Sequence, residues 1–455
     1  MMKTYDLTEG NIPKKLFFLS VPIMSVMFMQ CAFNIVDMFW LGKLGAESVA
    51  AVGSAGFYPW LAQAFILLTR VGGEVRVAQS IGDKNDEKAK TYVKSTLELS
   101  ILHGLIFGIL IMIFSKNLME VLNIKSNYVN ENGSIYLKLM GISMVCFFIN
   151  PIFSSIFNAM GNSKLPFKIN TIAILINIIL DPILIFGIFG LPGMGVFGAG
   201  LATVISIISS TVMFLTVIVK NKVKYFKVSL YKNIKTEIYT DLYKLGIPVC
   251  LQSGLFTVIS MCIAVIVARF GPKAIAAQEI GIQIESISFM TAEGISSAMV
   301  AFVGQNIGAK NPDRVIKGIK IGISFALFWG CVSLLFMIYL GTNIFSMFID
   351  DPESVRIGTS YLIIFGLNQP FNCSEIISNG IFKGVGRTVY PSAVSIIFNF
   401  IRIPMALILV ETMLGIDGIW IALSISSVLK GSFMLIALYL RCKSKTLYPG
   451  KEVNV

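Results

Sequence analysis

The stretch Ala78–Asp86, "AQSIGDKND", recurs 226 positions later as Gly304–Pro312, "GQNIGAKNP", with Gln, Ile, Gly, Lys and Asn kept in place. The same offset relates "LGAESVAAVGSAG", from Leu44, to "FGPKAIAAQEIGI", from Phe270. Farther along, "YLKLMG" and "YLIIFG" match at an offset of 225, as do "AMGNSKLP" and "GVGRTVYP". A nearly constant offset over several segments indicates that the chain consists of two copies of one structural unit.

The segments around these motifs are apolar and long. Of the 455 residues, 55% are hydrophobic and 14% are charged, whereas soluble domains are about a quarter charged. Apolar runs of about 17 or more residues, enough to cross a bilayer as a helix, recur along the chain. The sequence therefore predicts an all-α integral membrane protein with twelve transmembrane helices. We expect the spans at residues 15–41, 54–79, 95–115, 131–158, 169–189, 197–219, 246–269, 277–305, 318–341, 357–380, 389–410 and 418–440.

The basic residues predict the orientation of the spans. Lys and Arg gather in alternate loops and are densest in the connector 220–245. Because these residues are enriched in cytoplasmic loops, we expect both termini in the cytoplasm and the chain in the cytoplasmic membrane. Six spans per copy give both copies one orientation, so we expect two six-helix lobes related by a pseudo-two-fold axis along the membrane normal. The predicted domains are an N-lobe (1–219), a cytoplasmic connector (220–245), a C-lobe (246–440) and a cytoplasmic tail (441–455).

Residue usage argues against several other classes of function. The net charge of +12 comes from residues in the loops, so it does not indicate a nucleic-acid partner. The seven Cys form no CxxC pair, which indicates buried thiols. His103 is the sole histidine, and we interpret it as a packed or hydrogen-bonded residue. The first apolar run has no small-residue cleavage site, so we expect it to be a retained span. No cofactor is expected apart from a coupling ion.

The two copies differ in their intramembrane polar residues, beginning in the first span. Asn34 and Asp37 are three residues apart in "FNIVDMFWLG" and therefore share a helical face. At the same offset the second copy has Ser260 and Ile263.

A second pair, Asn177 and Asp181, lies in "NIILDPILIFG" (177–187) and aligns with Arg402 and Ala406 of the second copy. Thr203, at the start of the sixth span, aligns approximately with Ser426. The first copy therefore has two intramembrane carboxylates that the second copy lacks.

An isolated carboxylate inside a span costs about 2.5 to 3.5 kcal/mol even on translocon-based scales. One interpretation is structural, since Pro182 disturbs the helix and leaves groups that Asp181 could cap. The interpretation we favour is a site that takes up a proton or a small cation, because Asp37 and Asp181 have no basic partner in their own spans. Asn177 and Thr203 add neutral oxygen ligands that suit a hard cation.

Other charged residues within the spans are weaker candidates. Arg70 and Glu74 are four residues apart in "LLTRVGGEVRVAQ" and are expected to pair on the helix. Arg76 lies in the same unusually charged segment. Glu375 and Arg402 are expected to neutralise one another across the tenth and eleventh spans.

Together these features resemble the multidrug and toxic compound extrusion (MATE) transporters. The resemblance rests on twelve spans in two lobes, on the paired motifs quoted above, and on "NIVDMFWLG" and "NIILDPILIFG". It covers essentially the whole chain. It implies export of amphipathic, often cationic drugs and toxic compounds, driven by inward Na+ or H+ while the lobes alternate between outward-open and inward-open states.

The resemblance also implies roles for individual residues. Asp37, Asn177, Asp181 and Thr203 match the acidic, amide, acidic and hydroxyl positions of the family's N-lobe cation site, with Na+ or H+ as the bound ion. Pro22 matches a position associated with bending of the first helix.

One branch of the family also uses acids in the seventh and tenth spans. This chain has Phe256 and Asn372 at those positions, so we expect it to rely on its N-lobe. The residues expected to line the substrate cavity or to act in gating are Pro22, Gln30, Asn34, Asn158, Glu285 and Glu293.

Two other functions stay open at this point. A flippase of lipid-linked saccharide precursors has the same architecture, but it needs a broad basic cavity, for which Arg402 and Arg70 are the candidates. An intramembrane enzyme that holds Mg2+ needs an acid cluster near a membrane face, whereas Asp37 and Asp181 are expected in different spans near mid-depth, so we do not expect an enzyme. The expected partners are small amphipathic or cationic molecules and membrane lipid. We expect a monomer and no nucleic-acid partner.

Overall fold

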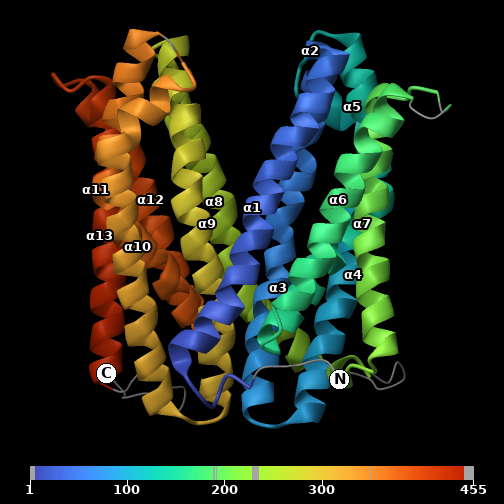
Figure 1. The fold of residues 1–455 in the computed structure, drawn as a ribbon, viewed down its shortest axis with the longest axis vertical. Coiled ribbons are helices and arrows are strands. Elements are labelled where there is room, and N and C mark those ends of the chain that lie inside the picture. Colours follow the sequence, from blue (N-terminus) through green and yellow to red (C-terminus); the bar gives the residue numbers. More distant parts are fainter. Residues whose placement is uncertain (1–5, 188–189, 191, 228–234, 350, 445–455) are drawn as a thin grey trace. The chain divides into compact units, whose positions relative to one another are not determined.

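A computed structural model describes residues 6–187, 190, 192–227, 235–349 and 351–444. Within these ranges every regular element is a helix (Figure 1). The helices are α1 (Ile12–Leu44), α2 (Ala46–Ala55), α3 (Phe57–Gly82), α4 (Asp86–Val121), α5 (Asn127–Ala159), α6 (Lys164–Phe186), α7 (Gly195–Lys220), η1 (Lys224–Phe226), α8 (Thr236–Ala268), α9 (Pro272–Gly308), α10 (Pro312–Ser346), α11 (Pro352–Val385), α12 (Val389–Val410) and α13 (Ile416–Lys443).

Eleven segments of the described chain are long and apolar enough to cross a membrane. They include α2 and α3, which together form one such segment (Ala46–Gly82). The all-α, multi-pass membrane class is thus confirmed. The predicted span 357–380 lies within α11, which has 34 residues but carries several polar side chains in its central part, among them Asn368, Gln369 and Glu375. These side chains are buried inside the protein, so α11 does not have the composition of a lipid-facing helix.

The repeat in the sequence is also a repeat in local conformation. Lys84 and Lys310, 226 positions apart, both have left-handed backbones, with φ of 54° and 53°. This conformation is uncommon for a residue with a side chain. The following Asn85 and Asn311 each accept a hydrogen bond from the backbone N–H three residues later and so cap α4 and α10. The two copies therefore enter their third long helices through the same turn.

The chain forms two compact units. The N-terminal unit holds Ser25–Ile247, and the C-terminal unit holds Leu7–Met24 together with the described part of Pro248–Val455. Helices α1 and α8 therefore each begin in one unit and continue in the other. The units differ in this respect from the predicted lobes, which divide at the connector 220–245.

Side-chain contacts hold the start of α8 in the N-terminal unit. Arg76 donates from Nε and Nη2 to the two carboxylate oxygens of Asp241, at 2.7 and 2.5 Å. Tyr92 also donates to Asp241, at 2.9 Å, and Tyr239 donates to Glu98 at 2.6 Å. These contacts give a structural role to Arg76, for which the sequence alone indicates none.

A matching set of contacts holds the residues before α1 in the C-terminal unit. Gln305 accepts a hydrogen bond from the Leu7 N–H at 2.9 Å, and Asn306 donates to the Leu7 carbonyl at 3.2 Å. The Arg314 guanidinium donates to the carbonyls of Leu7, Glu9 and Gly10. Because Gln305 and Asn306 belong to "GQNIGAKNP", this copy of the repeated motif anchors the entry to α1.

The lone histidine and the cysteines have structural surroundings. His103 lies 2.8 Å from the Tyr243 hydroxyl through Nε2, as expected for a hydrogen-bonded residue. All seven cysteines are free thiols, but only Cys373 is buried, so the expectation of buried thiols is wrong for the other six. Cys262 and Cys331 are exposed on apolar helices. Among the described residues, no group of His, Cys, Asp and Glu side chains has the arrangement of a metal site.

Reversing the Arg76–Asp241 pair tests the anchoring of α8. We expect Arg76→Glu and Asp241→Arg each to lower the thermal unfolding temperature in detergent by roughly 2 °C or more, because a forked ion pair becomes a like-charge contact. The double reversal should recover part of the loss. Lys90→Glu, which disrupts the exposed Lys90–Glu87 pair, is the control and should have little effect. Additive losses in the double variant would contradict a direct interaction.

Candidate functional site

The centre of the candidate site lies on α6. Asn177 and Asp181 are one turn apart on the buried face, with exposures of 1% and 0%. With the Asn177 amide oriented to satisfy its neighbours, its nitrogen donates to Asp181 Oδ2 at 2.8 Å. Its oxygen accepts from the backbone N–H of Thr203 at 3.1 Å. The amide therefore fixes one carboxylate oxygen and ties α6 to α7.

Small residues bring α7 against its neighbours at this depth. A Cβ atom at Gly198 would overlap the carbonyl group of Leu184 in α6, so only glycine permits this approach. A Cβ atom at Gly200 would stand 3.2 Å from the ring of Tyr136 in α5. Thr203 follows within one turn, and its hydroxyl donates to the Ala199 carbonyl at 3.0 Å. The close packing thus sets the Thr203 hydroxyl beside Asn177.

Tyr136 joins the site from α5. It contacts the Thr203 side chain and lies within electrostatic range of Asp37 and Asp181. The sequence pattern does not single it out as a site residue. The one feature of the sequence that could have pointed to Tyr136 is its recurrence in the second copy, where "YLIIFG" places Tyr361 at the equivalent position.

Asp37 approaches from α1, which runs beside α6. Thr171 of α6 contacts Met29 of α1 at 3.3 Å, and the rings of Trp40 and Phe186 meet edge to face at 6.1 Å. Between these contacts the half-buried Asp37 lies close enough for its charge to act on Asp181. The structure therefore brings together all four residues of the predicted cation site.

The two carboxyl groups of the site have no basic partner in the described structure. Asp181 Oδ1 is buried and has no hydrogen-bond partner among the described residues. Neither Asp37 nor Asp181 forms an ion pair with a described Lys or Arg. Two carboxylates close together in a water-poor environment favour the uptake of a proton or a cation by one or both of them.

The backbone around Asp181 supports the same chemistry. Pro182 has no N–H, so the carbonyl of Ile178 loses its usual intrahelical donor. Asp181 also lies five residues before Phe186, where α6 ends, and the last carbonyls of a helix carry partial negative charge. The sequence places Asp181 near mid-span, whereas in the structure it lies in the last two turns of α6. Freed carbonyls and helix C-termini are ligands for coupling ions in transporters.

The other predicted cavity and gating residues of the first copy lie outside this cluster. Gln30 and Asn34 are exposed on α1. Pro22 is buried in the part of α1 that belongs to the C-terminal unit. Asn158 is buried near the C-terminal end of α5, 22 residues or about 33 Å along the helix from Tyr136, so it does not take part in the site.

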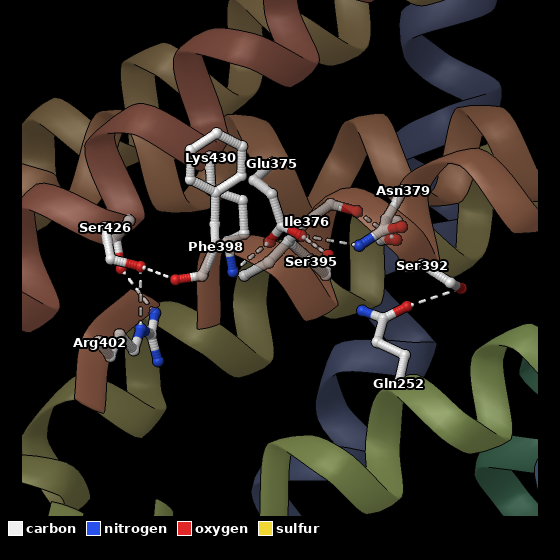
Figure 2. A network of polar contacts seen from close by, with 12 residues as sticks. Gln252, Glu375, Ile376, Asn379, Ser392, Ser395, Phe398, Arg402, Ser426 and Lys430 are labelled. Carbon is white, nitrogen blue, oxygen red and sulfur yellow. Dashed lines mark hydrogen bonds and ion pairs between the residues drawn. The ribbon is translucent and has the colours of Figure 1, made fainter. Parts of the chain in front are cut away.

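The remaining two predicted residues, Glu285 and Glu293, lie on α9 in the C-terminal unit, where both are half-buried. In the same unit, the expected neutralisation of Glu375 by Arg402 is not direct. Glu375 pairs instead with Lys430, at 3.5 Å (Figure 2). Lys430 lies 55 residues farther along the chain, on α13, a distance over which spacing in the sequence predicts no contact.

A comparison with protein families identifies the family. The MatE family profile matches residues 22–183 and 248–408, two segments that begin 226 positions apart. The chain belongs to the MatE family. The repeat that organises the sequence is therefore the family's own duplicated unit, and the resemblance to MATE transporters is confirmed.

Individual relatives also belong to the multidrug-resistance group of proteins. The chain is 28% identical over 435 residues to the probable multidrug resistance protein NorM of Thermotoga maritima, covering 94% of this chain and 92% of NorM. It is 27% identical over 427 residues to the probable multidrug resistance protein YoeA of Bacillus subtilis, covering 92% and 91%. The crystal structure of a MATE protein in the bent conformation matches the fold with a TM-score of 0.91 at 21% identity, over 98% of this chain and 100% of that one.

Adding a methyl group at Gly198 tests how the site is assembled. We expect Gly198→Ala to push α7 away from α6, because the new Cβ would meet backbone atoms of Leu184 that cannot rotate away. The variant should unfold at a lower temperature and should bind cations more weakly. Gly53→Ala, at a helical position with open space around it, is the control. Equal behaviour of the two variants would contradict the close-packing account.

Proposed function

We propose that this MatE protein is an antiporter that exports amphipathic, often cationic compounds across the cytoplasmic membrane, driven by inward movement of Na+ or H+. The observation that carries the proposal is the environment of Asp181. Its carboxylate is fully buried, one of its oxygens has no partner among the described residues, and the nearby charge is a second carboxylate.

Two neighbouring carboxylates inside the membrane destabilise the protein when no ion is bound, and a bound ion removes much of this cost. Each buried charge costs about 2.5 to 3.5 kcal/mol on the gentlest scale, and mutual repulsion adds to this cost. A bound Na+ or H+ removes the repulsion. Asn177 and Thr203 contribute oxygen ligands suited to Na+, while the carboxylates alone suffice for H+.

The proposed coupling uses the position of Asp37. Asp37 lies on α1, whereas Asp181 lies on α6, so an ion held by both joins two helices. Ion binding then favours one arrangement of α1 over another and lowers the affinity for the exported compound on the outer side. Energetic coupling of this kind requires that the ion bind the two conformations with different affinities. The multidrug-resistance names of the relatives support drug-like compounds as the cargo.

Transport in proteoliposomes tests the proposal. We expect efflux of a cationic dye under an imposed Na+ gradient, a pH gradient or both, and at least a tenfold loss of the rate in Asp37→Asn and in Asp181→Asn. Each substitution keeps the side-chain shape but removes the charge that attracts the ion. Membrane insertion and the size-exclusion profile should stay normal.

Asp83→Asn is the matched control, because Asp83 is an exposed carboxylate at the end of α3 in the same unit. It should transport at the wild-type rate. Wild-type efflux by both site variants, or efflux that neither gradient drives, would overturn the proposal.

A further inference from the structure

The C-terminal unit contains a second cluster of charged residues, two of them buried and two half-buried, built by α9, α11, α12 and α13. Its charged members are Glu285, Glu375, Arg402 and Lys430. In the part around Glu375 every charge has a direct partner (Figure 2). Glu375 pairs with Lys430 through one oxygen, while the other oxygen accepts hydrogen bonds from Asn379 and Ser395, both at 2.9 Å. Because both of its charges are paired, this part of the cluster has a structural role.

Arg402 is held differently. Nε donates to Ser426 at 3.2 Å and Nη2 donates to Ser427 at 2.9 Å. The Ser426 hydroxyl in turn donates to the Phe398 carbonyl at 2.6 Å (Figure 2). These neutral partners orient the guanidinium without neutralising it, and no described carboxylate forms an ion pair with it. A guanidinium has five N–H donors, so most of its capacity is left unused.

The Glu285 carboxylate lies near Arg402 but is not paired with it. One of its oxygens accepts a hydrogen bond from Tyr361 at 3.1 Å. Its charge acts on Arg402, yet the two do not form a direct ion pair. Beside Glu285 lies Gln369, which is fully buried and whose amide interacts with the Glu285 carboxylate. The Gln369 oxygen accepts a hydrogen bond from Ser288 at 2.8 Å. An oriented guanidinium and a carboxylate that is not ion-paired with it therefore lie in one cluster.

We propose that Arg402 binds the carboxylate of a zwitterionic or anionic amphipath. A planar guanidinium matches a carboxylate with two parallel hydrogen bonds, and the two serines hold it in a fixed orientation for that contact. Glu285, whose charge acts on Arg402 without a direct ion pair, suits the amine of a zwitterion. This inference rests on the proposed function only in taking the ligand to be an exported compound.

The alignment of the two copies supports the assignment of Arg402 as a binding residue. Arg402 occupies the position in the second copy that Asn177 occupies in the first. The same scaffold position thus serves a cation site in the N-terminal unit and an anion site in the C-terminal unit. The protein would then accept compounds that carry a carboxylate as well as purely cationic ones.

Two matched dyes provide the test: a rhodamine with a free carboxylate and its ethyl ester. Binding to the purified full-length protein is measured by fluorescence polarisation, without any ion gradient. We expect Arg402→Gln to weaken binding of the acid roughly tenfold, as for the loss of a charge-assisted hydrogen bond. Binding of the ester should be unchanged. Arg402→Lys should fall between wild type and Arg402→Gln, because it keeps the charge but loses the fork.

Arg269→Gln is the control, since it removes the same charge from an exposed position of the C-terminal unit. It should bind both dyes as the wild type does. Equal weakening of acid and ester by Arg402→Gln, or no weakening of either, would overturn the inference. Because no gradient is used, an acid-specific loss supports the Arg402 site even if the efflux assay fails, and normal efflux with no acid-specific loss rejects this site alone.

Discussion

A carboxylate buried without a counter-charge is the interaction on which this account depends. Asp181 is fully buried in a largely apolar helix and lies near Asp37 rather than near a Lys or Arg of the described chain. The surrounding structure holds it in place through the Asn177 amide and the close contact of α7 at Gly198. A protein that only needed to fold would be more stable with an apolar residue there. The proposed coupling ion gives this carboxylate a function.

The two copies of the repeat treat buried charge in opposite ways. In the N-terminal unit Asp37 and Asp181 form no ion pair with a Lys or Arg of the described residues. In the C-terminal unit Lys430 of the same chain pairs with Glu375 at 3.5 Å. The proposed ion site in one copy thus contrasts with an internal ion pair in the other. Arg402 is intermediate, since it is oriented by serines and not neutralised by a direct ion pair.

Features set by local spacing could be predicted from the sequence. The repeat, most spans and the pairing of Asn177 with Asp181 follow from residues close together in the chain or from a constant offset. Thr203 is a candidate from its place at the start of the sixth span, and the family resemblance implies the same role. In the structure its backbone N–H donates to the Asn177 amide oxygen. The length of each apolar run was enough to predict a helix, because a run of about 20 apolar residues is what a membrane-spanning helix requires.

Contacts between residues distant in sequence could not be predicted. Arg76 and Asp241 are 165 positions apart, and no pattern links them. The packing of Leu7–Met24 with the C-terminal unit also depends on distant partners such as Arg314. Tyr136 is one of many aromatic residues in apolar runs, so its role became visible only when α5, α6 and α7 were placed together. The depth of Asp181 depends on where α6 ends, and hydropathy locates helix ends poorly.

Whether Asp181 couples ion binding to substrate binding is tested most directly by measuring how the affinity for a substrate depends on the ion. The dissociation constant of a cationic dye is measured on purified protein across a range of Na+ concentrations and, separately, of pH. For the wild type we expect weaker dye binding as Na+ rises or as pH falls, by roughly 5-fold to 150-fold for ordinary coupling energies. In Asp181→Asn the dye affinity should not depend on either variable. An unchanged dependence in Asp181→Asn would contradict the account, because the coupling ion would then bind elsewhere.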